Sequence, residues 1–150
     1  MPLPKDWRAF IESLNSHGVE YLVVGAVALA HHGFPRYTGD LDVLVRGSSE
    51  NAARLERMLR DFGLGGLGLK ASDFVESYQV IQLGVPPQRI DILTSLTGVT
   101  FDAAWSTRTT AEIEGVPIHL IGREALIQNK RATGRPQDLA DLAALGEDPE

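Results

Sequence analysis

The chain has no cysteine among its 150 residues, which excludes disulfide bonds, zinc–thiolate centres and cysteine nucleophiles. It also has no long apolar run, and its longest apolar stretch, residues 21–30, is far too short to cross a bilayer. The first residues lack the apolar core of a secretory signal peptide. We therefore expect a cytoplasmic protein that does not enter a membrane.

The chain also has no excess of basic residues, since its formal net charge is −6. Proteins that bind nucleic acid without sequence preference usually carry a basic face that replaces phosphate counterions, so the acidic balance argues against that class. Hydrophobic residues make up 43% of the chain and charged residues 23%, as in ordinary globular proteins. The length suits one folded domain spanning residues 1–150.

The apolar periodicity predicts a mixed α/β fold, of the α+β type, with a central mixed sheet flanked by helices and closed by C-terminal helices. Helices are expected at 4–16, 26–32, 50–62, 101–106, 123–132 and 136–145. Strands are expected at 20–24, 40–45, 78–83, 89–93, 110–113 and 116–121, and the last four form two hairpins. Residues 63–68 include four glycines and are expected to form a flexible loop.

Asp40 and Asp42 stand two residues apart in an otherwise apolar strand. Side chains at this spacing share one face of a strand, so both carboxylates can reach the same cation. Two like charges this close repel each other, and a divalent metal relieves the repulsion. Hard oxygen ligands favour Mg²⁺ or Mn²⁺. The alternative is an edge strand with one solvated face.

Asp91 repeats this pattern between Ile90 and Ile92, inside another apolar strand. An aspartate in such a run needs a partner if it is buried. If the two strands are neighbours, Asp91 completes a site of three carboxylates. The alternative is again a solvated edge.

Val24, Gly25 and Ala26 form the step from an apolar strand into a short helix. A glycine at this position leaves backbone N–H groups bare, and such groups hold phosphate oxygens.

The order of these motifs resembles the polymerase-beta-type nucleotidyltransferase superfamily, in which a strand ending in glycine leads through a short helix to an Asp-x-Asp strand. Two further patterns, Arg36-x-Thr38-x-Asp40-x-Asp42 and Lys130-x-x-x-x-Arg135-x-x-Asp138, are similar to a bacterial branch of small stand-alone enzymes. That branch includes the nucleotidyltransferase toxins of abortive-infection and toxin–antitoxin systems. Ala26 departs from the family pattern, which usually has serine or glycine there.

The resemblance implies a nucleotidyltransferase fold and transfer of an NMP from an NTP such as ATP to a hydroxyl acceptor, with Mg²⁺ or Mn²⁺ as cofactor. The acceptor would be tRNA, a protein or a small molecule, and a cognate antitoxin is an expected partner. The alternatives are a weak or inactive nucleotidyltransferase-fold binding module and a purely structural partner protein. The resemblance assigns catalysis and metal binding to Asp40, Asp42 and Asp91, and nucleotide binding to Gly25, Ala26, Arg36, Thr38 and Lys130.

Two of these basic residues have plainer interpretations. Lys130 is equally well explained as a solvated helix lysine, and Arg36 as a residue of a surface turn. Arg135 and Asp138 are expected to form a local ion pair that fixes the last helix rather than to take part in catalysis.

Overall fold

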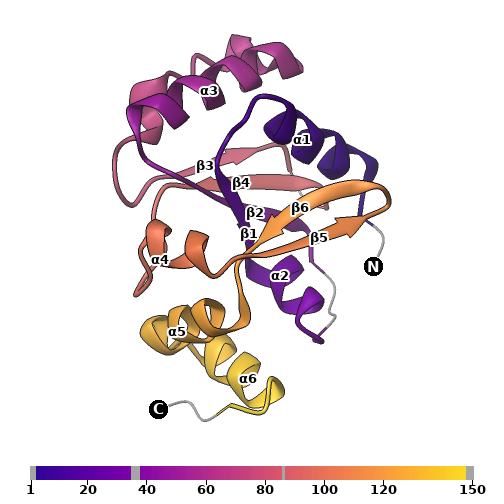
Figure 1. Cartoon of the computed structure of the whole chain (residues 1–150), viewed down its shortest axis with the longest axis vertical. Coiled ribbons are helices and arrows are strands. Elements are labelled where there is room, and N and C mark those ends of the chain that lie inside the picture. The colour runs from indigo at the N-terminus through magenta and orange to yellow at the C-terminus, as the bar shows by residue number, and fades with distance from the viewer. Residues whose placement is uncertain (1–2, 35–37, 86, 148–150) are drawn as a thin grey trace.

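The computed structural model describes residues 3–34, 38–85 and 87–147 and is built around one six-stranded sheet (Figure 1). The strands lie in the order β3-β4-β2-β1-β6-β5. Their bounds are β1 Tyr21–Val24, β2 Asp40–Val45, β3 Val80–Leu83, β4 Arg89–Leu93, β5 Thr109–Ile113 and β6 Val116–Leu120. The helices are α1 Lys5–Ser16, α2 Gly25–His31, α3 Ser49–Leu59, α4 Phe101–Ser106, α5 Arg123–Thr133 and α6 Pro136–Ala144.

The sheet is mixed, as the sequence predicts. Strand β2 runs antiparallel to β1 and parallel to β4, and β1 runs parallel to β6. The two outer strands, β3 and β5, pair antiparallel with β4 and β6, which confirms both hairpins. The order of helices and strands expected from the periodicity is also confirmed.

Helices cover the sheet from two sides. Figure 1 shows α1 and α3 on one side, and α2, α5 and α6 on the other. Helix α1 turns Trp7, Phe10, Ile11 and Leu14 into the core, where they lie at helical spacing. Helix α3 begins at a cap in which the Ser48 side chain accepts a hydrogen bond from the Asn51 N–H. Within the described ranges, no helix has the length and apolar character needed to cross a bilayer.

The expectation of a flexible loop at residues 63–68 is wrong. The regular helix α3 ends at Leu59, and the chain continues as a π-helical turn over Arg60–Leu64 and a 3₁₀ turn over Gly65–Leu67. Phe62 anchors this segment, because its ring meets Phe10 edge-to-face at 5.5 Å. Gly63 makes the change of direction possible with a φ of 95°.

Candidate metal and nucleotide site

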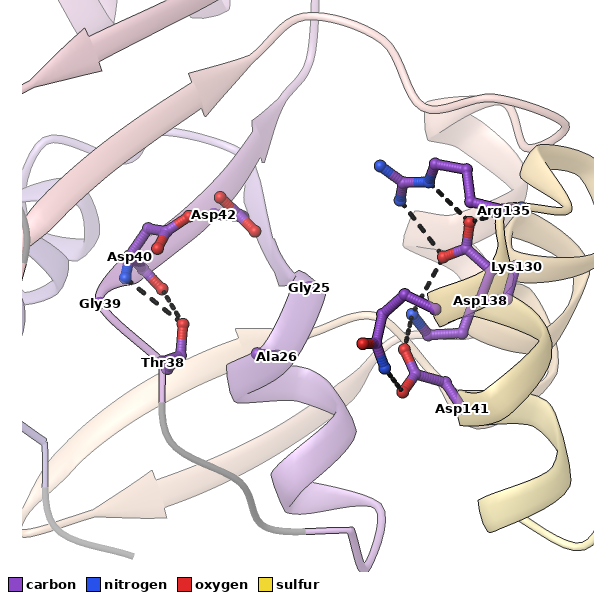
Figure 2. A pocket seen from close by; sticks show the side chains of 11 residues that line it. Gly25, Ala26, Thr38, Gly39, Asp40, Asp42, Lys130, Arg135, Asp138 and Asp141 are labelled. Carbon is purple, nitrogen blue, oxygen red and sulfur yellow. Dashed lines mark hydrogen bonds and ion pairs between the residues drawn. The ribbon is translucent and has the colours of Figure 1, made fainter.

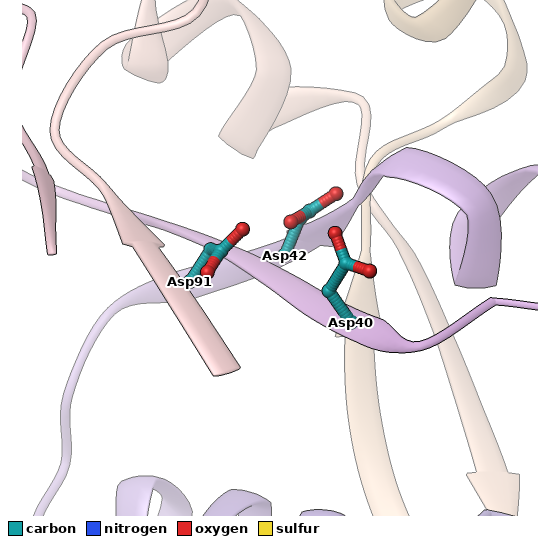
Figure 3. Close-up of side chains that lie close together, drawn as sticks. All are labelled: Asp40, Asp42 and Asp91. Atoms are coloured by element: carbon teal, nitrogen blue, oxygen red, sulfur yellow. The ribbon is translucent and has the colours of Figure 1, made fainter. Parts of the chain in front are cut away.

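Three carboxylates converge because of the register between β2 and β4. Asp40 and Asp42 share one face of β2, and Asp42 lies directly opposite Asp91 in the parallel pairing. Each of the three offers one oxygen within 4.8 Å of the others. Figure 3 shows the three side chains leaving neighbouring strands toward one point. The expectation that these two strands are neighbours is therefore confirmed. Asp91 is buried and does not lie on a solvated edge.

Burial and mutual repulsion make this cluster costly without a cation. Burial, followed by the charges of Asp91 and Asp40, raises the pKa of Asp42 to about 7. Asp91 is only 6% exposed, and its Oδ1 is a buried atom with no hydrogen bond. A group of acidic oxygens held in this way is the donor set that a hard divalent cation takes.

Arg89 partly compensates this charge from within β4. Its Nη2 donates to Asp40 Oδ2 and to Asp91 Oδ2, at 3.1 Å in each case. Its Nε lies 2.9 Å from Asp91 Oδ1, a close ionic contact that lacks the alignment of a hydrogen bond. The hydrogen bond with Asp91 raises the pKa of Arg89 above its ordinary value, so the guanidinium is charged.

Gly25 is required by the position of Asp42. Its φ is +68°, and a Cβ built on it would lie 2.2 Å from Asp42 Oδ2. Any other residue here would therefore collide with the carboxylate as well as strain the backbone. The glycine opens α2, whose first N–H groups have no acceptor within the helix.

A cleft of about 590 Å³ is lined by Asp40 and Asp42 (Figure 2). One wall carries Gly25, Ala26, Thr38, Gly39, Asp40 and Asp42. Thr38 holds the start of β2 in place, because its Oγ1 donates to the Asp40 carbonyl at 3.0 Å and accepts from the Asp40 N–H at 3.3 Å. The structure thus brings the expected phosphate-binding step and the Asp-x-Asp pair to the same cleft.

The opposite wall comes from α5 and α6 and is lined by Lys130, Arg135, Gln137, Asp138 and Asp141. Lys130 is not a solvated lysine, since its side chain is 8% exposed. Its Nζ donates to Asp141 Oδ2 at 2.8 Å and lies 3.6 Å from Asp138 Oδ1. The lysine therefore faces the cleft as part of a buried ion-pair network.

The predicted Arg135–Asp138 ion pair is confirmed, with Arg135 Nε 2.7 Å from Asp138 Oδ2. Burial alone would raise the pKa of Asp138, but hydrogen bonds from Arg135 and Thr133 outweigh it and lower that pKa to about 2. Asp138 is thus a permanent anion that anchors α6 to the end of α5.

The predicted site residues are brought together with one exception, Arg36, which lies outside the described residues. The sequence interpretation missed Arg89 and Asp141. Arg89 stands two residues before Asp91, so strand periodicity already places both on one face. Asp141 follows Asp138 at helical spacing, which places both on one face of α6.

Comparison with known proteins supports the fold. No protein-family model and no curated protein matches the chain. A solved structure of a proposed nucleotidyltransferase from Thermotoga maritima is similar at a TM-score of 0.62 and 18% identity, covering 96% of this chain and 94% of that one. An antigenic nucleotidyltransferase-like protein from Paracoccidioides brasiliensis is similar at 0.57 and 20%, covering 97% and 78%.

Identities this low establish a shared architecture and not a shared activity. They do not test membership of the toxin–antitoxin branch, and that membership stays a prediction. The mixed six-stranded sheet, its flanking helices and these two neighbours together show that the chain has a nucleotidyltransferase-like α/β fold.

Proposed function

We propose that this protein is a metal-dependent nucleotidyltransferase that moves an NMP from an NTP to a hydroxyl acceptor. The observation that carries the proposal is the convergence of Asp40, Asp42 and Asp91, of which Asp40 and Asp42 line an open cleft together with Gly25. A fold alone does not identify an activity, so the argument depends on the chemistry of these residues.

The three carboxylates supply the ligands for Mg²⁺ or Mn²⁺. A bound divalent cation would neutralise the triphosphate and lower the pKa of the acceptor hydroxyl. Asp91, the most buried of the three, is the proposed proton acceptor for that hydroxyl. The attacking oxygen forms a bond to the α-phosphorus, the bond to the β-phosphate oxygen breaks, and pyrophosphate leaves.

The remaining wall residues would position the nucleotide. Gly25 and Ala26 line the cleft, and their backbone N–H groups are proposed to hold phosphate oxygens. Lys130 has three N–H donors and contacts Asp138 and Asp141, and we assign it to the phosphates through its further donor capacity. Thr38 is assigned to nucleotide binding because it lines the cleft. Arg36 is assigned to nucleotide binding from the sequence pattern alone.

We propose a second groove, of about 550 Å³, as the place of the acceptor. It shares Arg135 with the cleft and includes Leu93, which stands two residues after Asp91 on the same face of β4. Among its described lining residues, Arg135 is the charged one and no carboxylate is present. This lining favours a neutral or anionic acceptor, such as an RNA end, over a polycationic small molecule.

The competing function is a binding module that holds nucleotide without turning it over. Ala26 favours it, because alanine lacks the hydroxyl that serine would offer to a phosphate. Binding of a metal–nucleotide complex without release of pyrophosphate would identify that function.

The test uses NTPs labelled at either the α- or the γ-phosphate, with Mg²⁺ or Mn²⁺ and with total RNA or protein as acceptor. Wild-type protein should transfer the α-label and release the γ-label as pyrophosphate, and Asp42→Asn should do neither. Asp6→Asn, an exposed aspartate in the first turn of α1, is the matched control and should behave as wild type. Equal activity of wild type and Asp42→Asn would refute the proposal, and so would transfer of the γ-label.

A further inference from the structure

Arg89 donates hydrogen bonds to carboxylate oxygens that a metal ion would need as ligands. It lies opposite Asp40 in the β2–β4 pairing and two residues before Asp91, so all three side chains share one face of the sheet. Its guanidinium contacts both carboxylates, with Nη2 3.1 Å from an oxygen of each. The Arg89 side chain is 26% exposed and contacts the side chain of Asp91, which is 8% exposed. The guanidinium is therefore part of the cluster in the metal-free protein.

The charge of the cluster explains the position of Arg89. Three ionised carboxylates within reach of one another carry three negative charges, and the guanidinium removes one of them. Among the described residues, Arg89 is the cation that forms ion pairs with these carboxylates. It thereby holds β2 and β4 together at the site in the metal-free protein.

The same position puts Arg89 in conflict with a divalent cation. A metal bound to Asp40 and Asp91 would share their oxygens with a guanidinium a few ångström away, and the two positive charges would repel each other. A bound triphosphate changes this balance, because its oxygens match the forked donors of an arginine. The cleft that would hold the phosphates is bordered by Asp40, to which Arg89 is bonded.

We propose that Arg89 is a positioning residue that competes with the divalent cation for Asp40 and Asp91, so that metal binds tightly only when a nucleotide draws the guanidinium to its phosphates. Metal and nucleotide then bind cooperatively, and each raises the affinity of the site for the other by the same factor. This inference rests on the proposed function, since the nucleotide is the ligand that moves Arg89.

The experiment is a calorimetric titration with Mn²⁺, with and without a non-hydrolysable NTP analogue. Wild-type protein should bind Mn²⁺ weakly alone and at least about tenfold more tightly with the analogue, a difference of about 1.4 kcal/mol. Arg89→Gln should bind Mn²⁺ about tenfold more tightly than wild type without nucleotide, and should lose most of the cooperativity. It should also melt at a lower temperature than wild type in EDTA.

Arg89→Lys is a control for loss of folding, because it keeps one positive charge at the cluster. Lysine cannot bridge two carboxylates, because it lacks the planar fork of an arginine. It should give an intermediate Mn²⁺ affinity. Arg57→Gln, on the exposed side of α3, is the control and should leave Mn²⁺ binding and cooperativity unchanged.

Two results would overturn the proposal. One is an Mn²⁺ affinity in Arg89→Gln and Arg89→Lys that equals or falls below that of wild type, which is the outcome of a purely structural role. The other is a wild-type affinity that does not depend on the nucleotide analogue. The labelled-NTP assay separates the two hypotheses: transfer by wild type with unchanged metal binding in Arg89→Gln refutes only the role of Arg89.

Discussion

Replacing Asp42 by asparagine should stabilise the metal-free protein at alkaline pH, although it removes a residue of the site. The pKa of Asp42 is raised from 3.8 to about 7 in the folded protein. A carboxyl group with a raised pKa binds its proton more tightly in the folded state, so the free energy of unfolding falls as the pH rises from about 4 to about 7. Above that range the full penalty is present, and asparagine, which has no charge to lose, avoids it.

The size of the effect follows from the shift. About three pKa units at 1.36 kcal/mol each give an upper limit of about 4 kcal/mol. Solvent at the open side of the cleft screens the charge, which leaves about 2 kcal/mol. For a chain of this length that corresponds to an increase in Tm of about 4–8 °C.

The assay is thermal unfolding in EDTA, and in Mn²⁺ with a non-hydrolysable NTP analogue, at about pH 8.5 and at about pH 5. In EDTA, Asp42→Asn should melt above wild type at the higher pH, and by less than half of that margin at the lower one. With Mn²⁺ and the NTP analogue the order should reverse at the higher pH, because only wild type gains stability from the bound metal and nucleotide. Asp6→Asn should follow wild type throughout. The reasoning fails if Asp42→Asn melts below wild type in EDTA at the higher pH, or if Mn²⁺ with the analogue stabilises both proteins equally.

Two further predictions concern the walls of the cleft. Lys130→Met should lower the free energy of unfolding by about 3–5 kcal/mol in urea titrations, because it leaves two buried aspartates of α6 without their ammonium partner. A loss below about 1 kcal/mol would show that the network does not hold α5 and α6 together. Gly25→Ala should abolish Mn²⁺ binding, since its Cβ would meet Asp42 Oδ2 at 2.2 Å. Gly18→Ala has the same φ of +68° with open space around it, so it controls for backbone strain and should keep metal binding.

The parts of the site that follow local periodicity could be predicted from the sequence. The two-residue spacing of Asp40 and Asp42 was enough to place both on one face, and the apolar run around Asp91 predicted a carboxylate that needs a partner if it is buried. Gly25 was recognisable as the residue after a buried strand. Its close approach to Asp42 was not, because it depends on the antiparallel pairing that sets Val24 opposite Asp42.

The features that escaped prediction depend on contacts between distant segments. Arg89 bonds to Asp40, 49 positions earlier in the chain, and that contact exists only because β4 lies beside β2. The sequence explained Lys130 equally well as a phosphate-binding residue and as a solvated helix lysine, and its burial depends on the packing of α6 against α5. The segment that begins at Gly63 was predicted to be a flexible loop because it contains four glycines. The sequence does not show that the ring of Phe62 packs against the core and holds this segment in place.

The most direct test of the metal–nucleotide site is to count the Mn²⁺ ions bound, by electron paramagnetic resonance, in the presence of a non-hydrolysable NTP analogue. Wild-type protein and Asp6→Asn should take up Mn²⁺ that depends on the analogue, and Asp42→Asn and Asp91→Asn should not. Equal Mn²⁺ uptake by wild type and both cluster variants would contradict the assignment of Asp40, Asp42 and Asp91 as the metal ligands.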